Sequence, residues 1–460
     1  MEQFNDLMKA LEAGSYNAAP STLTQGSALQ VEDLSPVMEL VTFEDKHIKL
    51  QKMLSSKDAK STLIQYNRQL DYGIFGGSAQ YEGGIGEEDT SNFVRAIVPM
   101  AYYSTTRRVS VAANMVAAFD GTKAEDRAAN DAAMKLSADI EFDSFRGQSD
   151  FSNAGVFDGN PLAISNMPAM QGLDVQIRMS DALSNTQDLM FAEFGSDQSV
   201  ILSVNGTLTQ SLIEDGAVRS AMNHGEADKL ILDPISLAQY NKIAHAKERI
   251  MLAGSPQEAT GAHLRTQWTS SSVISMEASR FLSGKTRPAR ARAGSPAAPS
   301  FTPTSPVNAD SVLDAGTYQY YVTSANERGE SLASAAQAVA VAAGDAAVLT
   351  ISQVQGARHY NVYRSAAGGS AASAKFVGKV KDSGAATSVF TDLGNREPGS
   401  VTGYLLQSNT ASFYQLAAYS RMKLAISDLS LPEAHFRFLC LAVKQPRKNV
   451  LFENISGQQS

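Results

Sequence analysis

Few residues in this chain have both the type and the spacing that catalysis or metal binding requires. The six histidines are scattered, and no Ser-His-Asp or paired-carboxylate arrangement stands out. His245 and Glu248 lie one helical turn apart, a spacing that a metal site can use. Because no second histidine lies on that face, a solvated helix surface is the favoured interpretation. We therefore expect a protein that is not an enzyme and that binds no metal and no cofactor.

Two glycine-containing segments resemble phosphate-binding loops only in part. Gly84 and Gly86 have no third glycine at the dinucleotide spacing, and no Gly-Lys-Ser/Thr follows them. The tripeptide GKT at 284–286 imitates the end of a phosphate-binding loop, but Ser279 stands where the first glycine is needed. A proline-rich run also replaces the helix that should follow. We expect neither segment to bind phosphate.

The composition is typical of a globular protein that does not coat nucleic acid. Of the 460 residues, 43% are hydrophobic and 19% are charged, and the formal net charge is -8. A negative protein is poorly suited to neutralising phosphates, although a container that must not adhere to packaged nucleic acid would also be acidic. The length predicts two or more folding units, each able to bury a core.

The single cysteine, Cys440, excludes an internal disulfide framework and a multi-cysteine zinc site. It lies in the apolar run FRFLCLAV, which predicts a buried structural thiol. The N-terminal segment lacks the features of a signal peptide, and no apolar run is long enough to span a bilayer. These features predict folding in a reducing cytoplasm, without a membrane partner.

The longest predicted helix covers 122–147, and we expect the rest of the fold to be organised around it. Its start carries a capping box, in which Thr122 and Glu125 satisfy each other's amides, and Gly147 ends it. Spacings of four, three and four place a narrow apolar stripe on one face, at Ala129, Ala133, Leu136 and Ile140. We call this element the spine helix and expect the stripe to pack in the core.

The chain before the spine helix has little apolar sequence to bury by itself. Residues 1–71 are predicted to form an N-terminal arm that begins with a short amphipathic helix and lies across another surface. Residues 72–113 are predicted to form an extended hairpin loop, which is glycine-rich at first and β-rich over 93–101 and 102–111. Both segments need a partner surface.

The hairpin carries charges of both signs. An acidic run can face a basic pair either within the hairpin or on a neighbouring molecule, although an ordinary solvated hairpin would also explain them. We expect these residues to make intersubunit contacts: Glu87, Glu88, Asp89, Arg107 and Arg108.

The region after the spine helix has an α+β pattern. Helical periodicity returns over 175–194, whereas 195–213 is predicted to be a loop. The run KLIL at 229–232 predicts a strand, and Asp233 followed by Pro234 predicts the start of a helix. Near the C-terminus we expect a helix over 411–426 and strands at 436–443 and 449–455.

A change of composition divides this α+β region. Residues 286–306 are rich in Pro, Ala, Ser and Arg and are predicted to form a linker. Its arginines, Arg287, Arg290 and Arg292, could contact nucleic acid, but arginines in a linker more often serve solubility. Residues 307–403 then show strand alternation with glycine-rich turns, as in a β-sandwich. Because a helix and apolar strands follow, we expect the sandwich to be an insertion in a domain that resumes at 404–460.

The sandwich sequence resembles fibronectin type III and related immunoglobulin-like modules. Their pattern G-x-Y-x-Y-x-V, followed by N-x-x-G-E-S, matches Gly316, Tyr318, Tyr320, Val322, Asn326, Gly329, Glu330 and Ser331. The order differs, because the YNVYR-type strand at 360–364 should precede this pattern and instead follows it. This order is compatible with a permuted sandwich of that family and with a sandwich that only resembles it.

The order of segments outside the insertion resembles the major capsid protein of tailed bacteriophages, with the Hong Kong phage-type shell fold. The likeness rests on QVEDLSPVMELVTFEDKHIKLQKML and QYNRQLDYG in the arm, the glycine-rich segment before VPMAYYSTTRRVS, the spine helix, and FAEFGSDQSVILSVNG. The likeness lies in the order of the segments and in their local sequences more than in an invariant motif. In that family the hairpin reaches over the adjacent subunit and the arm crosses a neighbour.

The resemblance implies a fold and an assembly. It implies an α+β shell fold with a peripheral domain at 114–214, an axial domain whose first part is 215–285, and a return of both domains at 404–460. Hexamers and pentamers, assembled in the host cytoplasm, would build an icosahedral head around double-stranded DNA, and the protein would be found in the virion. Implied partners are a portal, decoration or scaffold proteins, and DNA contacted non-specifically at the inner surface. The inserted sandwich would be exposed outside.

A tail-associated or surface adhesin that uses the sandwich as its binding head is the alternative. The missing signal peptide speaks against a cell-surface adhesin but not against a tail protein.

Overall fold

The structure of the protein is a computed structural model, and it describes residues 44–69, 72–73, 78–86, 88–91, 93–115, 123–147, 169–183, 199–247, 266–285, 288, 290–291, 293–326, 328–394, 396–426 and 428–456. Several predicted features lie outside these residues: the N-terminal helix, Glu87, the capping residue Thr122, the side chain of His245, and Glu248. The chain divides into two compact units, each described by itself. One includes 106–132 and 421–434, and the other includes 45–105, 133–420 and 435–460.

The described helices are α2 (Leu50–Met53), α3 (Val111–Met115), α4 (Ala124–Arg146), α6 (Leu173–Leu183), α8 (Gln210–Met222) and α9 (Pro234–Lys247). Short 3-10 turns lie at Asp45–His47, Arg280–Leu282, Ala371–Ser373, Ser408–Thr410 and Pro446–Lys448. The spine helix corresponds to α4, which ends at Arg146, directly before Gly147, as predicted.

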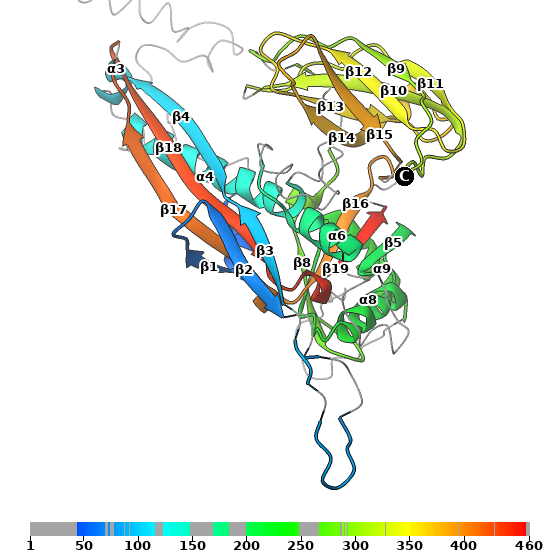
Figure 1. Cartoon of the computed structure of the whole chain (residues 1–460). Helices are drawn as coiled ribbons and strands as arrows, with labels where there is room; N and C mark the ends of the chain where they lie inside the picture. Colours follow the sequence, from blue (N-terminus) through cyan, green and yellow to red (C-terminus); the bar gives the residue numbers. More distant parts are fainter. Residues whose placement is uncertain are drawn as a thin grey trace, which may run out of the picture. The chain divides into compact units, whose positions relative to one another are not determined.

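The second unit contains a six-stranded sheet. Its order is β5 (Ile201–Gly206), β19 (Val450–Ile455), β16 (Val401–Leu406), β6 (Lys229–Leu232), β8 (Val273–Ala278) and β7 (Thr266–Trp268). Of these strands, β5, β19, β16 and β8 are labelled in Figure 1. The chain leaves this sheet after β8 and returns to it at β16, and both strands are hydrogen-bonded to β6. The segment between them can therefore fold as a separate insertion.

Two further sheets lie outside the insertion. A four-stranded sheet has the order β1 (Ser55–Asp58), β17 (Ala411–Lys423), β18 (Ser430–Val443) and β4 (Ala101–Ser110). A two-stranded sheet pairs β2 (Leu63–Gln69) with β3 (Phe93–Pro99). Helices together with mixed and antiparallel sheets agree with the predicted α+β class.

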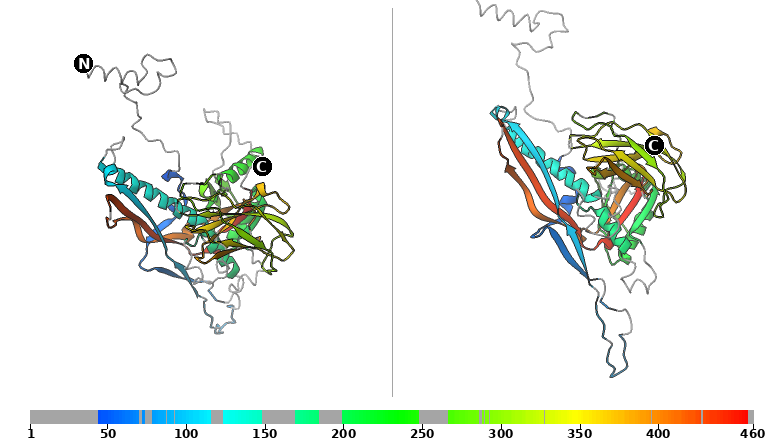
Figure 2. Two further views of the ribbon diagram at one scale, coloured as in Figure 1. Left: turned by 90° about the horizontal axis from the view of Figure 1, so that it is seen from above. Right: turned by 45° about the horizontal axis from the view of Figure 1, so that its top comes forward.

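The inserted segment forms two antiparallel sheets, drawn from green through yellow to orange in both views of Figure 2. One has the order β11 (Gln337–Val341), β10 (Gly316–Ala325), β13 (His359–Arg364) and β14 (Lys375–Lys381). The other has the order β15 (Thr387–Asp392), β12 (Ala347–Ser352) and β9 (Phe301–Thr304). Alternate residues of both sheets share one core, which includes Tyr320, Val322, Leu349, Ile351, Tyr360 and Phe390.

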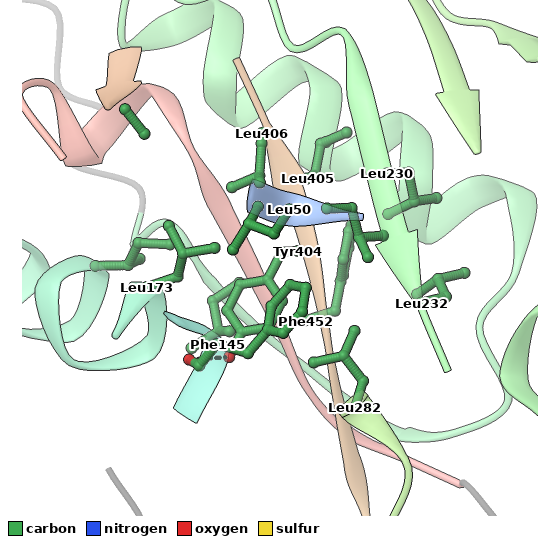
Figure 3. Packing of buried hydrophobic residues seen from close by; sticks show 14 of the residues in the cluster. Leu50, Phe145, Leu173, Leu230, Leu232, Leu282, Tyr404, Leu405, Leu406 and Phe452 are labelled. Atoms are coloured by element: carbon green, nitrogen blue, oxygen red, sulfur yellow. Dashed lines mark hydrogen bonds between the residues drawn. The ribbon is translucent and has the colours of Figure 1, made fainter. Parts of the chain in front are cut away.

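The core around the six-stranded sheet centres on Tyr404 of β16. Its hydroxyl donates to the carbonyl of Phe145 at 3.0 Å, and the two rings lie 5.6 Å apart (Figure 3). Phe452 of β19 and Leu173 of α6 are buried in the same cluster. On α8, a Cβ added at Gly216 would lie 2.7 Å from Cζ of Phe452, so glycine lets this helix lie directly on the sheet.

Part of the predicted N-terminal arm contributes to this core. Leu50 and Leu54 are buried there, and α2 is held by the carboxylate of Glu141 on α4. Burial raises the pKa of Glu141, although the amides of Leu50, Gln51 and Lys49 favour its ionised form.

Three secondary-structure predictions were wrong. The segment 411–426, predicted as a helix, contains β17, because its backbone pairs with β1 and with β18. The segment 195–213, predicted as a loop, contains β5 and the start of α8, whose N-cap Thr209 accepts the Leu212 amide. The linker predicted over 286–306 ends in β9, which pairs with β12.

Candidate assembly surfaces

The predicted hairpin loop is anchored at its base and exposed at its tip. In the β2–β3 pair, Leu63 lies opposite Pro99 and Gln69 lies opposite Phe93, so 70–92 connects the two strands. In the described part of this connection, Tyr72, Tyr81 and Ile85 are 92%, 94% and 93% exposed. Large apolar side chains with this exposure gain stability when a partner covers them.

The base of the hairpin is fixed by contacts to β18. The hydroxyl of Tyr66 donates to the carbonyl of Val443 at 3.0 Å, and the Arg68 guanidinium donates to the same carbonyl at 3.1 Å. A small core joins Ile64, Val98, Met100, Ala442 and Cys440. Cys440 is buried as predicted, and burial raises the pKa of its thiol to about 12, so it is an inert structural side chain.

The two limbs of the loop approach each other at Gly73 and Asp89. Gly73 has a φ of +114°, which other residues rarely adopt, and a Cβ there would collide with the Asp89 carboxylate. Asp89 also accepts the amide of Thr90 at 2.7 Å. Glycine at 73 therefore allows the loop to close beside an exposed acidic residue.

Within the chain, Arg108 of the predicted basic pair contacts an aspartate outside the acidic run 87–89. Arg108 lies 3.0 Å from Asp428 in an exposed ion pair of the first unit. The Ser430 hydroxyl, with Arg108, lowers the pKa of Asp428. Arg107 is partly buried on β4, whereas Glu88 and Asp89 are exposed in the hairpin connection.

The stripe predicted on the spine helix is buried in its second half. Leu136 and Ile140 are 2% and 0% exposed, whereas Ala129 and Ala133 are partly exposed. Ala132 rather than Ala133 is fully buried.

A charged cluster at the start of α4 was not found from the sequence. The Arg421 guanidinium lies 3.4 Å from Glu125, 3.7 Å from Asp126 and 3.7 Å from Glu433, and Lys423 lies 3.5 Å from Glu125. Arg421 and Lys423 lie two residues apart on β17, so they share a face of the strand. The helix predicted over 411–426 would have placed residues two apart on different faces, so the cluster was missed.

The residues that the structure describes include no group of three His, Cys, Asp or Glu side chains that could hold a metal ion. The helices within the same ranges include none that is long and apolar enough to cross a membrane.

Comparison with known proteins gives partial sequence similarity to capsid proteins. No family model matches the chain. A stretch of 117 residues is 28% identical to the major capsid protein of Staphylococcus phage K, covering 25% of each protein. A stretch of 151 residues is 27% identical to a putative major capsid protein of Enterococcus phage phiEF24C, covering 32% of this chain and 31% of that protein. The chain thus matches about a quarter to a third of the length of these relatives.

Solved capsid structures align with most of the chain at low identity and with TM-scores under 0.5. The capsid of a native GTA particle aligns with 96% of this chain and 100% of its own, at 9% identity and a TM-score of 0.49. The capsid of the cyanophage P-SCSP1u aligns with 96% of this chain and 100% of its own, at 8% identity and a TM-score of 0.46.

Proposed function

We propose that this chain is the major capsid protein of a tailed phage, and that it self-assembles into the icosahedral head that encloses a double-stranded DNA genome. The sequence similarity to major capsid proteins of Staphylococcus and Enterococcus phages is the observation that carries the proposal. The role is structural and not enzymatic, and the protein resides in the virion.

The exposed hairpin tip supports this role. Tyr81 and Ile85 are each more than nine-tenths exposed, while the base of the hairpin is fixed by Tyr66 and Arg68. An element that is rigid at its base and apolar at its tip is suited to contact a second copy of the chain. Repetition of one such contact produces a closed symmetric assembly.

The proposed shell fold assigns roles to the segments. In hexamers and pentamers, exposed parts of the arm at 1–71 and of the hairpin at 72–113 contact neighbouring subunits, whereas α2, β1 and β4 within these segments belong to the subunit's own fold. The peripheral domain at 114–214 contains the spine helix, and the axial domain at 215–285 resumes in 404–460. A portal, decoration or scaffold proteins, and the packaged DNA at the inner surface complete the set of proposed partners.

The inserted segment is, in this proposal, an immunoglobulin-like sandwich on the outer surface. Tyr318 lies near the start of β10, and its hydroxyl donates to the carbonyl of Asp314 at 2.7 Å. A tyrosine at the start of strand F that bonds back to the backbone a few residues upstream is a hallmark of that fold. This contact supports the identification of β10 as strand F.

The strand order supports a permuted member of that fold. With β10 as strand F, the order β11-β10-β13-β14 corresponds to G-F-C-C′ and the order β9-β12-β15 corresponds to A-B-E. The spatial order is then conventional, whereas the F–G hairpin occurs in the chain between strands A and B. This arrangement accounts for the YNVYR strand, β13, following the G-x-Y-x-Y-x-V strand instead of preceding it.

Expression of the full chain followed by electron microscopy tests the proposed function. We expect closed shells or capsomers, and a strictly monomeric, compact protein under all assembly conditions would contradict the proposal. The double variant Tyr81→Ser, Ile85→Ser should fold and assemble poorly. Val389→Ser is the matched control, because Val389 is also exposed, at 50%, but lies on β15 of the sandwich.

A further inference from the structure

Lys285, Glu330 and Asn361 form a connected group of an amine, a carboxylate and a carboxamide. We propose that this group is a self-modification site, at which Nζ of Lys285 and Cγ of Asn361 join in an intramolecular amide bond. Glu330 is the catalytic group that moves the proton. The proposal does not depend on the proposed capsid role.

The carboxylate of Glu330 holds both reacting groups at once. Its Oε2 lies 3.0 Å from Nζ of Lys285, and its Oε1 accepts from Nδ2 of Asn361 at 2.8 Å. The amine and the amide are therefore gathered at the two oxygens of one carboxylate. Attack requires the amine to move from this carboxylate to within roughly 3–3.5 Å of Cγ.

Glu330 itself is held in place by two hydroxyl groups. Tyr363 donates to its Oε1 at 2.8 Å, and the Thr323 hydroxyl donates to the same oxygen. Although burial raises the pKa of Glu330, Lys285 and these hydrogen bonds lower it overall. Glu330 is therefore ionised at neutral pH and can accept a proton.

Asn361 is an unusual residue for the centre of a sheet. It lies on β13, paired with Thr323 on one side and Lys379 on the other, and it is 0% exposed. Its Oδ1 is buried without a hydrogen-bond partner among the described residues. Buried polar atoms are seldom left unsatisfied, and those that are often mark a functional position.

The surroundings of the amine are aromatic. Nζ of Lys285 lies 5.7 Å from the centre of the Phe376 ring, which contacts the Tyr363 ring edge-on at 5.9 Å. Asn361 is fully buried and the Glu330 side chain is 16% exposed, whereas the Lys285 side chain is 37% exposed, so the amine reaches the buried amide from the solvent side.

The step balances without a further reactant. Oε2 of Glu330 takes a proton from the Lys285 ammonium, and the neutral amine attacks Cγ of Asn361. As the intermediate collapses, the protonated Glu330 carboxyl gives this proton to Nδ2, the bond between Cγ and Nδ2 breaks, and ammonia leaves. The carboxylate then takes the second proton from the attacking nitrogen and releases it to solvent, where the ammonia becomes ammonium. One amide replaces another, with no oxidation or reduction. The product ties the segment before the sandwich to its central strand β13.

The mass of the full-length chain tests the proposal directly. After incubation at neutral pH and denaturation, we expect a mass lower than that of the sequence by one ammonia. Trypsin cuts after Arg280, Arg358 and Arg364, so a branched peptide should join 281–290 to 359–364, with no cut at Lys285. Separate peptides 281–285 and 359–364 in fully incubated protein would overturn the proposal, whatever the variants do.

Variants assign the roles. Lys285→Arg and Asn361→Ala should abolish the branched peptide, and Glu330→Gln should reduce its rate of formation at least tenfold, because the glutamine cannot carry the proton. Lys379→Arg is the matched control, since Lys379 lies beside Asn361 in the sheet, and it should form the bond normally. A bond that forms at the wild-type rate in Glu330→Gln, or that persists in Lys285→Arg, would contradict the assigned chemistry.

Discussion

Glu141 on the spine helix accepts the backbone amide of Leu50 at 2.6 Å, although the two residues are 91 positions apart. The same carboxylate accepts the amides of Lys49 at 2.9 Å and Gln51 at 3.1 Å. These amides belong to the first turn of α2, where no intrahelical partner exists. A side chain from a distant element thus supplies the cap that the local sequence lacks, and it fixes the N-terminal segment on α4.

Replacement of Glu141 should therefore destabilise the second unit. Glu141→Ala leaves three buried or part-buried amides without their acceptor, and we expect a loss of more than about 2 kcal/mol in the free energy of unfolding. Glu141→Gln keeps one acceptor oxygen and should lose about 1–2 kcal/mol. Denaturant unfolding of both variants measures these values. Equal stability of Glu141→Ala and wild type would show that the cap contributes nothing.

The buried part of the spine helix predicts a second effect. Leu136→Asp or Ile140→Asp places a carboxylate where the wild-type side chain is 2% or 0% exposed. We expect each to cost more than about 4 kcal/mol and to prevent folding. Ala129→Asp is the control, because Ala129 is only partly buried. Soluble yield and circular dichroism distinguish the two groups, and well-folded Leu136→Asp would mean that this face is not core.

Arg108 predicts the opposite behaviour. Its ion pair with Asp428 is exposed, with side chains that are 56% and 53% accessible, so solvent screens it strongly. Arg108→Ala should leave the melting temperature unchanged, and if Arg108 contacts a neighbouring subunit it should impair assembly. Light scattering of the assembling protein, with Asp428→Ala as a comparison, separates the two effects. A variant that fails to fold would show that Arg108 serves the fold itself.

The strands and helices that the sequence predicted well are those with a local cause. Pro234 begins α9, where the Asp233 carboxylate accepts the Ile235 amide at 2.9 Å, and Gly147 ends α4. The run 411–426 has no such local cue: its apolar residues fit a helix, and only pairing with β1 and β18, which are distant in the chain, makes it a strand. For this run, pairing with distant strands decided between helix and strand, which the periodicity of its apolar residues could not do.

The candidate surfaces show the same division. Glycine density marked the connection between β2 and β3, because an extended loop needs freedom of the backbone. The hairpin predicted over 72–113 was wrong at both ends, because β2 starts at Leu63 and 102–111 belongs to β4, which lies beside β18 in another sheet. The partner of Arg108 was not predictable, since Asp428 comes from a turn 320 positions away. The group of Lys285, Glu330 and Asn361 was likewise hidden, because Lys285 directly precedes the predicted linker, Glu330 lies in the segment after β10, and Asn361 lies on β13.

The buried ion pair of the sandwich predicts strong and specific coupling. Nη1 of Arg364 lies 2.7 Å from Oδ2 of Asp392, which also accepts the Tyr320 hydroxyl at 3.1 Å. Asp392→Asn leaves the guanidinium buried without its counter-charge and should cost about 3–5 kcal/mol. The double variant Arg364→Met, Asp392→Leu should recover much of that loss. A double-mutant cycle by thermal unfolding checks the coupling, and additive effects would contradict it.

His359 predicts how the sandwich responds to acid. Burial, with the nearby Lys379 and Lys285, lowers the pKa of His359 to about 3. The folded pKa lies below the unfolded value of about 6.5, so the neutral side chain stabilises the folded state above that pH. As the pH falls from about 6.5 towards 3, His359 becomes protonated in the unfolded state but stays neutral in the folded state. The free energy of unfolding therefore falls by up to about 1.4 kcal/mol per pH unit. His359→Gln has no such proton to bind. The melting temperature of the variant minus that of wild type, measured by calorimetry, should therefore increase as the pH is lowered from 7 to 4.5. A difference that stays constant over this range would mean that His359 titrates alike in the folded and unfolded chains.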